Sequence, residues 1–389
     1  MMKEKVFSFI DDNKKEILSL WEELVNMESG SQDIEGVDAV INRVREELEK
    51  NGAQTHVYEY EKAGNMVVGN YAGGDKPGAI LMGHLDTVFP KGEVAKRPFK
   101  IEDGKAYGPG VLDMKGGVVA ALFAAKALHA CGYNDRPIKV MFAGDEEIGH
   151  VHSDAAEKIK QEAKGYGATF NCETAFVDNS IVVGRKGTAT FKVVVHGVAA
   201  HAGNNPKGGR SAILEMAHKV IDIQKLTNWE EQTTFNVGVI KGGVVFNAVP
   251  DYCEVQVDVR YVDPNLVPEI KERIEKVLAK TYVEGTTTEL VDFRVGIQAM
   301  QTTKGVENLF AYMAKVSEEN GFGKPVPVKS GGGSDAAYTV IAGVPTLCSM
   351  GVKGANNHSK TEYAVVDSIF ERAKLLTALI LRMDEFQNN

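Results

Sequence analysis

The stretch AILMGHLDTVFP (residues 79–90) begins as an apolar run that leads into a histidine and an aspartate. Ala79–Met82 has the length and composition of a buried strand, and Gly83 follows it directly. His84 and Asp86 then stand one residue apart, on the same side of an extended backbone. Such a pair either closes a local hydrogen-bonded turn or presents a ligand with the group that orients it. The rest of the chain has to decide between these two interpretations.

Further short apolar runs alternate with helical stretches along the chain. Ile138–Ala143 and Ala168–Cys172 have the composition of buried strands, and Gly116–Ala130 has that of a helix. Helices are also expected within the first forty residues, after Val306 and close to the end of the chain. Strands separated by helices predict an α/β fold, with a mixed, mostly parallel sheet flanked by helices.

A different pattern occupies residues 185–297. Two helical stretches each stand between strands, and residues 255–259 alternate valine with polar side chains, as a half-exposed strand does. The order strand–helix–strand–strand–helix–strand predicts a two-layer, ferredoxin-like domain. The expected organisation is therefore one domain of residues 1–184 and 298–389, interrupted by an inserted domain of residues 185–297.

The composition limits the classes of partner. The chain has 389 residues with a formal net charge of −9, which argues against nucleic acid, because neutralising phosphates requires a basic face. No apolar run is long enough to span a membrane, and acidic residues stand near the start where a signal peptide would be apolar, so a cytoplasmic location is expected. The four cysteines lie far apart and are expected to be buried thiols rather than disulfides.

Side chains of the type that binds metals follow most of the expected strands. Because ligands gather at the carboxyl ends of strands in an open α/β sheet, we expect these side chains to converge. They are His84, Asp86, Asp113, Asp145, Glu146, Glu147, Glu173 and His358. Imidazole and carboxylate groups suit Zn²⁺ and similar ions, and a bridging carboxylate allows two ions ~3.5–4 Å apart. The predicted cofactor is a pair of divalent metal ions, zinc first, with cobalt or manganese as alternatives.

Glu146 and Glu147 are adjacent, and we expect them to have different tasks. Neighbouring side chains in an extended segment or tight turn point in different directions, so one glutamate can bind metal while the other acts as a general base. Asp86 could accept the second imidazole N–H of His84 and so determine its tautomer. His150 and His152 follow closely in the chain and are expected to lie in a polar loop.

In combination these motifs resemble a known family, the bimetallic zinc peptidases and deacylases that include carboxypeptidase G (a glutamate carboxypeptidase), aminoacylase and succinyl-diaminopimelate desuccinylase. HLDTV, GPGVLDMKGG, GDEEIG, CET and NNHSKTEY are similar to the motifs of that family. The resemblance implies that Asp86 orients a ligand, that Glu146 is the base and that a cis peptide follows Asp113. It also implies two metal sites, one formed by His84, Asp113 and Glu173, and the other by Asp113, Glu147 and His358.

The inserted domain is similar to the family's lid and dimerisation domain. GVAAHAGNNPKGGRSAI resembles the stretch whose histidine enters the partner subunit's site, which implies that His201 stabilises an oxyanion and that the chain is a homodimer. FNAVPDYCEVQVDVRY resembles the stretch that binds the substrate carboxylate, here through Asn247 and Arg260. In SGGGSDAAY, Gly332 and Gly333 could offer backbone N–H groups to the same carboxylate, or form only a turn before a helix.

The expected activity is that of a di-zinc metallocarboxypeptidase, an amide hydrolase acting on N-acyl amino acids or short peptides with a free C-terminal carboxylate. The alternatives are a dedicated biosynthetic deacylase or desuccinylase and a non-catalytic metal-dependent peptide binder, although a binder has no need of a base such as Glu146. The loop TAFVDNSIVVG after Glu173 contains no lysine or arginine. Preference for a glutamate side chain, against an apolar or aromatic one, is therefore left open.

Overall fold

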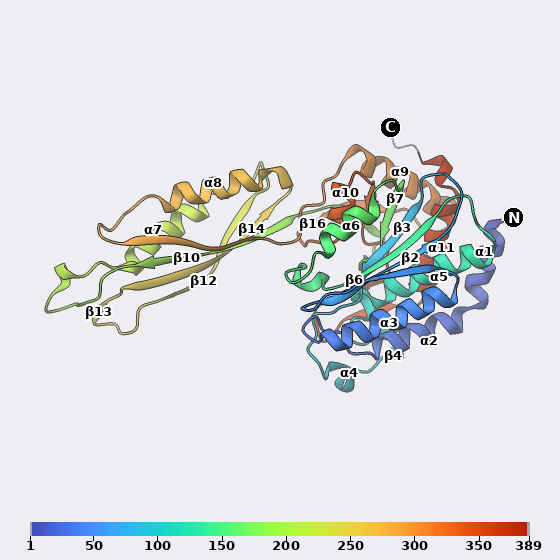
Figure 1. Cartoon of the computed structure of the whole chain (residues 1–389), viewed down its shortest axis with the longest axis horizontal. Coiled ribbons are helices and arrows are strands. Elements are labelled where there is room, and N and C mark those ends of the chain that lie inside the picture. The colour runs from blue at the N-terminus through green and yellow to red at the C-terminus, as the bar shows by residue number, and fades with distance from the viewer. Residues whose placement is uncertain (1, 387–389) are drawn as a thin grey trace. The chain divides into compact units, whose positions relative to one another are not determined.

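The computed structural model describes residues 2–386, which form two compact units (Figure 1). The first comprises the chain up to Gly184, Thr302–Lys329 and the chain from Ser334 onward, and the second comprises Arg185–Gln301 and Ser330–Gly333. Compared with the expected boundaries, the second unit also includes residues 298–301 and the loop 330–333. The reason is backbone pairing, because Arg185 and Met300 exchange N–H···O bonds of 3.0 Å and the Lys186 N–H donates to Ser330 O at 3.0 Å.

A six-stranded mixed sheet forms the centre of the first unit. Its strands, in spatial order, are β1 (Gln54–Tyr58), β2 (Gly64–Tyr71), β6 (Ile138–Gly144), β3 (Ala79–His84), β7 (Ala168–Asn171) and β17 (Thr346–Leu347). From β6 to β17 all neighbours are parallel, whereas β2 pairs antiparallel with both β1 and β6. β3 and β6 are buried along their whole length, as their continuous apolar runs require. The expected mixed, mostly parallel sheet is confirmed.

Helices surround this sheet (Figure 1). The helices of the first unit are α1 (Met2–Asp12), α2 (Lys14–Val25), α3 (Ile34–Lys50), α4 (Glu93–Lys96), α5 (Gly116–Ala130), α6 (Ala155–Ala163), α9 (Lys304–Glu319), α10 (Ala336–Ile341) and α11 (Asp367–Leu381). The short α4 lies away from the sheet (Figure 1). α5 packs against β3 and β6 on one side and against α2 and α11 on another, which suits a helix that has almost no polar face. The burial of α5 therefore fixes the position of the turn that precedes it, Val111–Lys115.

A second, smaller sheet in the first unit was not expected from the sequence. Its strands, in spatial order, are β4 (Lys100–Glu102), β5 (Lys105–Tyr107), β19 (Tyr363–Val365), β18 (Lys353–Ala355) and β8 (Ala175–Phe176). Asp113 follows β5, Glu173 precedes β8, and His358 lies between β18 and β19. This sheet thus brings together three chain segments that carry predicted metal ligands. Two further strands, β9 (Ser180–Arg185) and β16 (Val326–Ser330), pair with each other.

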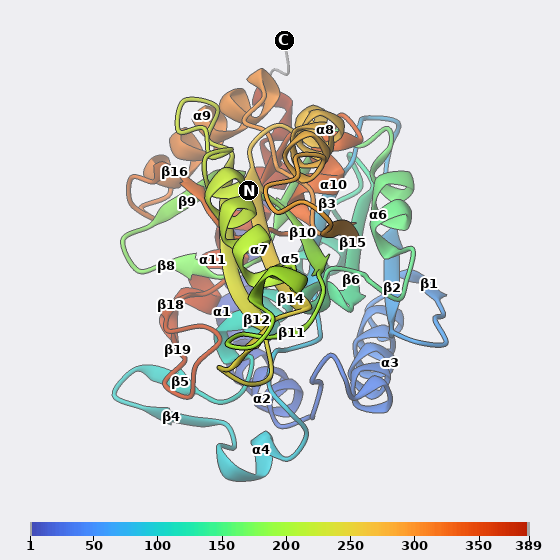
Figure 2. The same ribbon diagram turned by 90° about the vertical axis from the view of Figure 1, so that its left-hand side faces the viewer.

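The second unit is a four-stranded antiparallel sheet covered by two helices. Along the chain its elements are β10 (Gly187–His196), α7 (Ala212–Gln224), β12 (Thr234–Gly242), β14 (Tyr252–Tyr261), α8 (Val267–Leu278) and β15 (Thr287–Val295). The strands lie in the order β12-β14-β10-β15, and α7 and α8 pack against each other and against the sheet (Figure 2). Phe191, Val257 and Ile274 belong to its core. The expected ferredoxin-like order of strands and helices is confirmed.

Two expectations from composition also concern the fold. No helix within residues 2–386 combines the length and the apolar character needed to cross a membrane. All four cysteines are buried free thiols, as their spacing predicted.

Candidate metal centre

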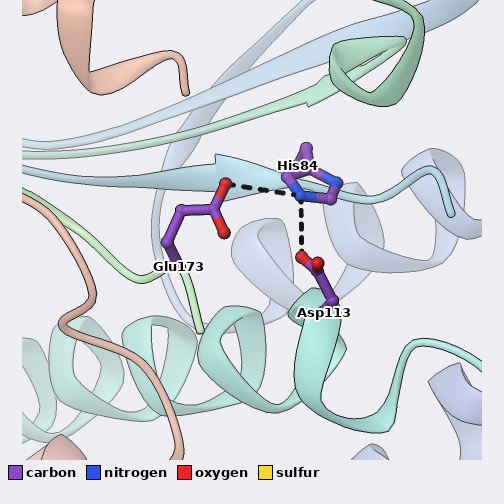
Figure 3. Close-up of side chains that lie close together, drawn as sticks. All are labelled: His84, Asp113 and Glu173. Atoms are coloured by element: carbon purple, nitrogen blue, oxygen red, sulfur yellow. Dashed lines mark ion pairs between the residues drawn. The ribbon is translucent and has the colours of Figure 1, made fainter. Parts of the chain in front are cut away.

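His84 lies at the carboxyl end of β3, and only 1% of it is exposed. Its Nε2 atom is 3.3 Å from Asp113 Oδ1 and 3.6 Å from Glu173 Oε1 (Figure 3). Glu173 comes from the loop after β7, and Asp113 comes from the turn before α5. The ligand atoms of these three residues all lie within 4.8 Å of one another. The parallel strands β3 and β7 bring His84 and Glu173 to one edge of the sheet, and Asp113 reaches them from the turn before α5.

A second triplet of ligand atoms shares Asp113 with the first. His358 Nε2 lies 3.0 Å from Asp113 Oδ2 and 3.3 Å from Glu147 Oε2. These three ligand atoms too lie within 4.8 Å of one another. Asp113 therefore directs Oδ1 to one triplet and Oδ2 to the other, which is the geometry of a carboxylate that bridges two ions.

Asp86 connects the first triplet to the adjacent glutamates. The Nδ1 atom of His84 is 3.0 Å from Asp86 O and 3.3 Å from Asp86 Oδ1. A proton on Nδ1 satisfies these oxygens and leaves Nε2 to face the ligand cluster. Asp86 also accepts the backbone N–H groups of Glu146 and Glu147, each at 3.1 Å, and the Ser31 hydroxyl at 2.7 Å. One buried carboxylate thus orients the histidine and holds the turn that carries both glutamates.

Glu362 holds the turn around Asp113 and was not singled out from the sequence. Its carboxylate is fully buried and accepts the backbone N–H groups of Leu112 at 2.8 Å, Asp113 at 3.0 Å and Gly110 at 3.3 Å. Burial raises the pKa of Glu362 to about 7. The peptide bond between Asp113 and Met114 is cis, as the family resemblance implied.

The neighbouring carboxylates favour the charged form of both candidate histidine ligands. Hydrogen bonds to Asp113 and Glu147 raise the pKa of His358 to about 11. Burial lowers the pKa of His84, but hydrogen bonds to Asp113 and Asp86 outweigh that effect and keep its pKa well above the ordinary value. Burial likewise raises the pKa of Glu146 well above its usual range. The site is therefore an anionic cluster that strongly favours positive charge.

The residues present fit a pair of divalent cations. Each triplet offers one imidazole nitrogen and two carboxylates, the donor set preferred by zinc and related ions. Glu147 Oε1 is buried and has no hydrogen-bond partner among the described residues, as expected for an atom that awaits a ligand. Glu146 belongs to neither triplet, although its Oε2 lies 4.0 Å from His84 Nε2. Its carboxylate therefore lies beside the candidate ligands without being one of them.

His150 lies in a turn, as expected, but it is buried rather than solvated. Only 7% of it is exposed, and its ring bridges two aspartates, with Nδ1 2.6 Å from Asp145 Oδ1 and Nε2 2.7 Å from Asp335 Oδ1. The backbone at Gly149 and His150 is left-handed, with φ of 67° and 56°, and turns the ring inward. His152 is exposed, in agreement with the expectation.

His201 and Asn247 lie together in the second unit, because β11 (Ala200–His201) pairs with β13 (Ala248–Val249). The Ala202 N–H donates to Asn247 O at 3.0 Å. The Nδ1 atom of His201 accepts two backbone N–H groups, from Gly203 and Asn204, each at 3.1 Å. A neutral His201 ring must therefore carry its proton on Nε2, and the side chain is exposed.

Arg260 lies in the second unit with the glycine-rich loop. Its Nη1 is 3.4 Å from Gly331 O, and its Nε donates to Asp258 at 2.9 Å. The Gly332 N–H donates to Ser330 Oγ at 3.2 Å, so in this conformation it serves the loop itself. The Arg185 guanidinium binds the carbonyl oxygens of Gly332 and Gly333, at 3.3 and 3.1 Å.

Arg260 and His201 belong to opposite ends of the second unit. β13 joins β14 at Tyr252, and Arg260 lies near the other end of that strand. At ~3.3 Å per residue, the rise from Tyr252 to Arg260 is about 26 Å. The structure therefore places His201 beside Asn247 at one end of the second unit. It places Arg260 beside the glycine-rich loop at the other end.

Comparison with known proteins gives one consistent result. The model of Peptidase family M20/M25/M40 matches residues 80–382. The chain is 32% identical over 384 residues to carboxypeptidase G2 of Pseudomonas sp. (strain RS-16), which covers 97% of this chain and 91% of that protein. It is 26% identical over 328 residues to the succinyl-diaminopimelate desuccinylase of Alkalilimnicola ehrlichii, covering 79% of this chain and 84% of that protein.

Solved structures show the same fold. A tripeptidase from Staphylococcus aureus superposes with a TM-score of 0.80 at 21% identity, covering 96% of this chain and 99% of the other. A metallo-carboxypeptidase from Sulfolobus solfataricus superposes with a TM-score of 0.73 at 19% identity, covering 94% and 98%. At these identities the likeness concerns the fold alone, and it covers both units.

Proposed function

The chain belongs to peptidase family M20/M25/M40, a family of metal-dependent hydrolases, and from that membership we propose that it cleaves the amide bond of N-acyl amino acids or short peptides with a free C-terminal carboxylate. This is an activity of the carboxypeptidase G2 type. The observation that carries the proposal is the position of Asp113, whose two oxygens face separate triplets. A carboxylate in this position suits a hydrolase with two metals, and zinc is the metal that we propose.

Glu146 is the proposed general base and acid. The bound metals would be held by the two triplets, and they would polarise the substrate carbonyl and make water more acidic. Glu146 takes the proton of the attacking water and returns it to the leaving nitrogen. Two observations support this role. Glu146 is buried beside both triplets but belongs to neither, and its burial raises the pKa of its carboxyl group.

The second unit supplies the residues that we propose to stabilise the oxyanion of the reaction and to bind the terminal carboxylate of the substrate. His201 donates from Nε2 to the oxygen that becomes negative, a role supported by the two backbone donors that occupy Nδ1. Arg260 binds the terminal carboxylate with its guanidinium, helped by Asn247 and by N–H groups of the glycine loop. The Gly332 N–H would first have to leave Ser330 Oγ.

We further propose that the active form is a homodimer. A rise of about 26 Å along β14 separates the end bearing His201 and Asn247 from Arg260, which is far more than a dipeptide spans. One small substrate therefore cannot contact both groups of a single second unit. A two-fold dimer removes this conflict, because His201 and Asn247 of one chain can serve the site of the other.

The test is Glu146→Gln, assayed on the zinc-reconstituted protein with a panel of N-acyl amino acids and dipeptides. We expect both metal ions to be retained and kcat/KM to fall by about 10²–10⁴-fold, the contribution of a general base. Exposed Glu61→Gln is the matched control and should behave as the wild type. Unchanged hydrolysis in Glu146→Gln would remove this residue from the mechanism. A wild type that retains metal and hydrolyses no member of the panel would instead support the binder alternative.

A further inference from the structure

A cavity of about 450 Å³ in the first unit adjoins the second triplet. Two loops and one turn line it, residues 30–33, residues 87–91, and Glu147 with Ile148. Its volume is within the range of small-molecule sites. Because Glu147 is a member of the triplet, a group bound in this cavity would lie directly beside the metal ligands.

The cavity wall is held in place by backbone contacts. The Ser31 N–H donates to Thr87 O at 3.0 Å, and the Thr87 N–H donates to Ser29 O at 2.8 Å. At Gly30 an added Cβ would stand 2.1 Å from Phe89 O, so only glycine allows the two loops to approach this closely.

The same wall is connected to the metal ligands. The Ser31 hydroxyl donates to Asp86 Oδ2 at 2.7 Å, and that same oxygen accepts the Glu147 N–H at 3.1 Å. One carboxylate therefore fixes the cavity and the ligand turn relative to each other, and the cavity does not need to be created by the substrate.

The lining favours an uncharged group. Val88 is 42% exposed although the stretch before it is buried, and Phe89, Pro90 and Ile148 add further apolar surface. The charges of Lys91 and Asp33 compensate each other across 2.9 Å. Lys91 is thus already paired and does not present a free cation to an anionic group.

We propose that this cavity binds the acyl group of the substrate, on the carbonyl side of the bond that is cleaved, and that it selects uncharged, apolar acyl groups over anionic ones. The inference rests on the proposed function. The carbonyl must lie at the triplets, and the amino-acid half carries a carboxylate that needs a cation. The cavity offers no uncompensated cation, so it suits the other half of the substrate.

The test compares three substrates with the same amino-acid half, the N-acetyl, N-butyryl and N-succinyl derivatives, on the zinc-loaded wild type. We expect kcat/KM to be about tenfold higher for butyryl than for acetyl, because an apolar pocket rewards each added methylene. The succinyl derivative matches the butyryl one in chain length but ends in a carboxylate. We expect it to be hydrolysed about tenfold or more slowly than the butyryl substrate.

Val88→Arg places a cation on the cavity wall and is expected to shift the butyryl-to-succinyl ratio of kcat/KM at least tenfold toward succinyl. Val326→Arg, at a valine of 52% exposure outside the cavity lining, is the matched control and should leave the ratio unchanged. An unchanged ratio in Val88→Arg, or a wild type that prefers succinyl, would overturn the assignment of the cavity.

Binding measurements separate this inference from the proposed function. Dissociation constants of the butyryl and succinyl substrates are measured with zinc-loaded Glu146→Gln and with Glu146→Gln/Val88→Arg. If butyryl binds more tightly and Val88→Arg reverses that order while the wild type hydrolyses nothing, the cavity assignment stands and the proposed function fails. If the wild type hydrolyses the substrates but Val88→Arg changes neither binding nor rate, the proposed function stands and the cavity assignment fails.

Discussion

Asp86 accepts the backbone N–H of Glu147 at 3.1 Å, so the residue that orients a member of the first triplet also holds a member of the second. The same carboxylate accepts the Glu146 N–H and lies beside His84 Nδ1. His84 belongs to the first triplet, Glu147 belongs to the second, and Glu146 is the proposed base. The two triplets and the proposed base are therefore coupled through a single buried side chain, and a change at Asp86 should affect all three.

Asp86→Asn is expected to weaken binding of both metals by about 10–100-fold, the usual cost of losing a group that orients a ligand. The amide has one acceptor oxygen where the carboxylate has two, so one of the two glutamate N–H groups loses its partner. Competition with a zinc chelator measures the change. Asp75→Asn, at an exposed position, is the control. Equal chelator resistance of Asp86→Asn and wild type would contradict the coupling.

Metal binding should release protons and should tighten as the pH rises. In the metal-free protein the pKa of His358 is raised to about 11 and that of His84 lies well above its ordinary value, so both rings are protonated near neutral pH. Each ring must lose its proton before it can bind a cation, and the apparent affinity should rise by about tenfold or more per pH unit. Calorimetry in buffers of different ionisation enthalpy counts the released protons. Binding without proton release would contradict the assignment of these histidines as ligands.

Much of this arrangement could be predicted because several candidate ligands stand at the ends of apolar elements. α5 begins and ends where its apolar run does, at Gly116 and Ala130. β3 extends to His84 itself. A ligand placed at the end of a continuous apolar run is visible in one sequence, and the convergence of such ends at one sheet edge follows from parallel topology.

The features that the sequence did not predict show no hydrophobic periodicity. β8 is the two residues Ala175–Phe176, too short to show alternation. Glu362 and His150 stand in polar stretches that look exposed, and they are buried only because distant segments fold over them. Their partners, the Asp113 turn and Asp335, are far away in the sequence, so no local pattern could have identified either contact.

His150 should stabilise the protein in a way that depends on pH. Burial alone would lower its pKa, but the carboxylates of Asp335 and Asp145 outweigh burial and hold the pKa well above the ordinary value. Because the folded-state pKa is raised, this stabilisation is fully present below about pH 6.5 and is lost as the pH rises through the folded-state pKa. Removing one partner of such a buried ionic cluster is expected to cost roughly 3 kcal/mol.

The measurement is denaturant unfolding of metal-loaded wild type and His150→Gln at about pH 6 and about pH 10. The difference in unfolding free energy should be largest at the lower pH and should shrink at the higher one. His152→Gln, at the exposed histidine of the same turn, should cost little at either pH. A difference for His150→Gln that stays constant across this range would show that the ring acts only by filling space.

Mixing two inactive variants tests whether His201 acts across the proposed dimer. Glu146→Gln keeps His201 but lacks the base, and His201→Ala keeps the base but lacks the oxyanion donor. After unfolding and refolding together in equal amounts, half of the dimers contain one chain of each kind. If His201 serves the partner's site, every mixed dimer has one complete site, and activity returns to about a quarter of the wild-type value. If His201 serves its own chain, no complete site can form and the mixture stays as inactive as its components.

The separation of His201 from Arg260 along β14 favours the first outcome. A mixture without recovered activity, from chains shown to form mixed dimers, would overturn it.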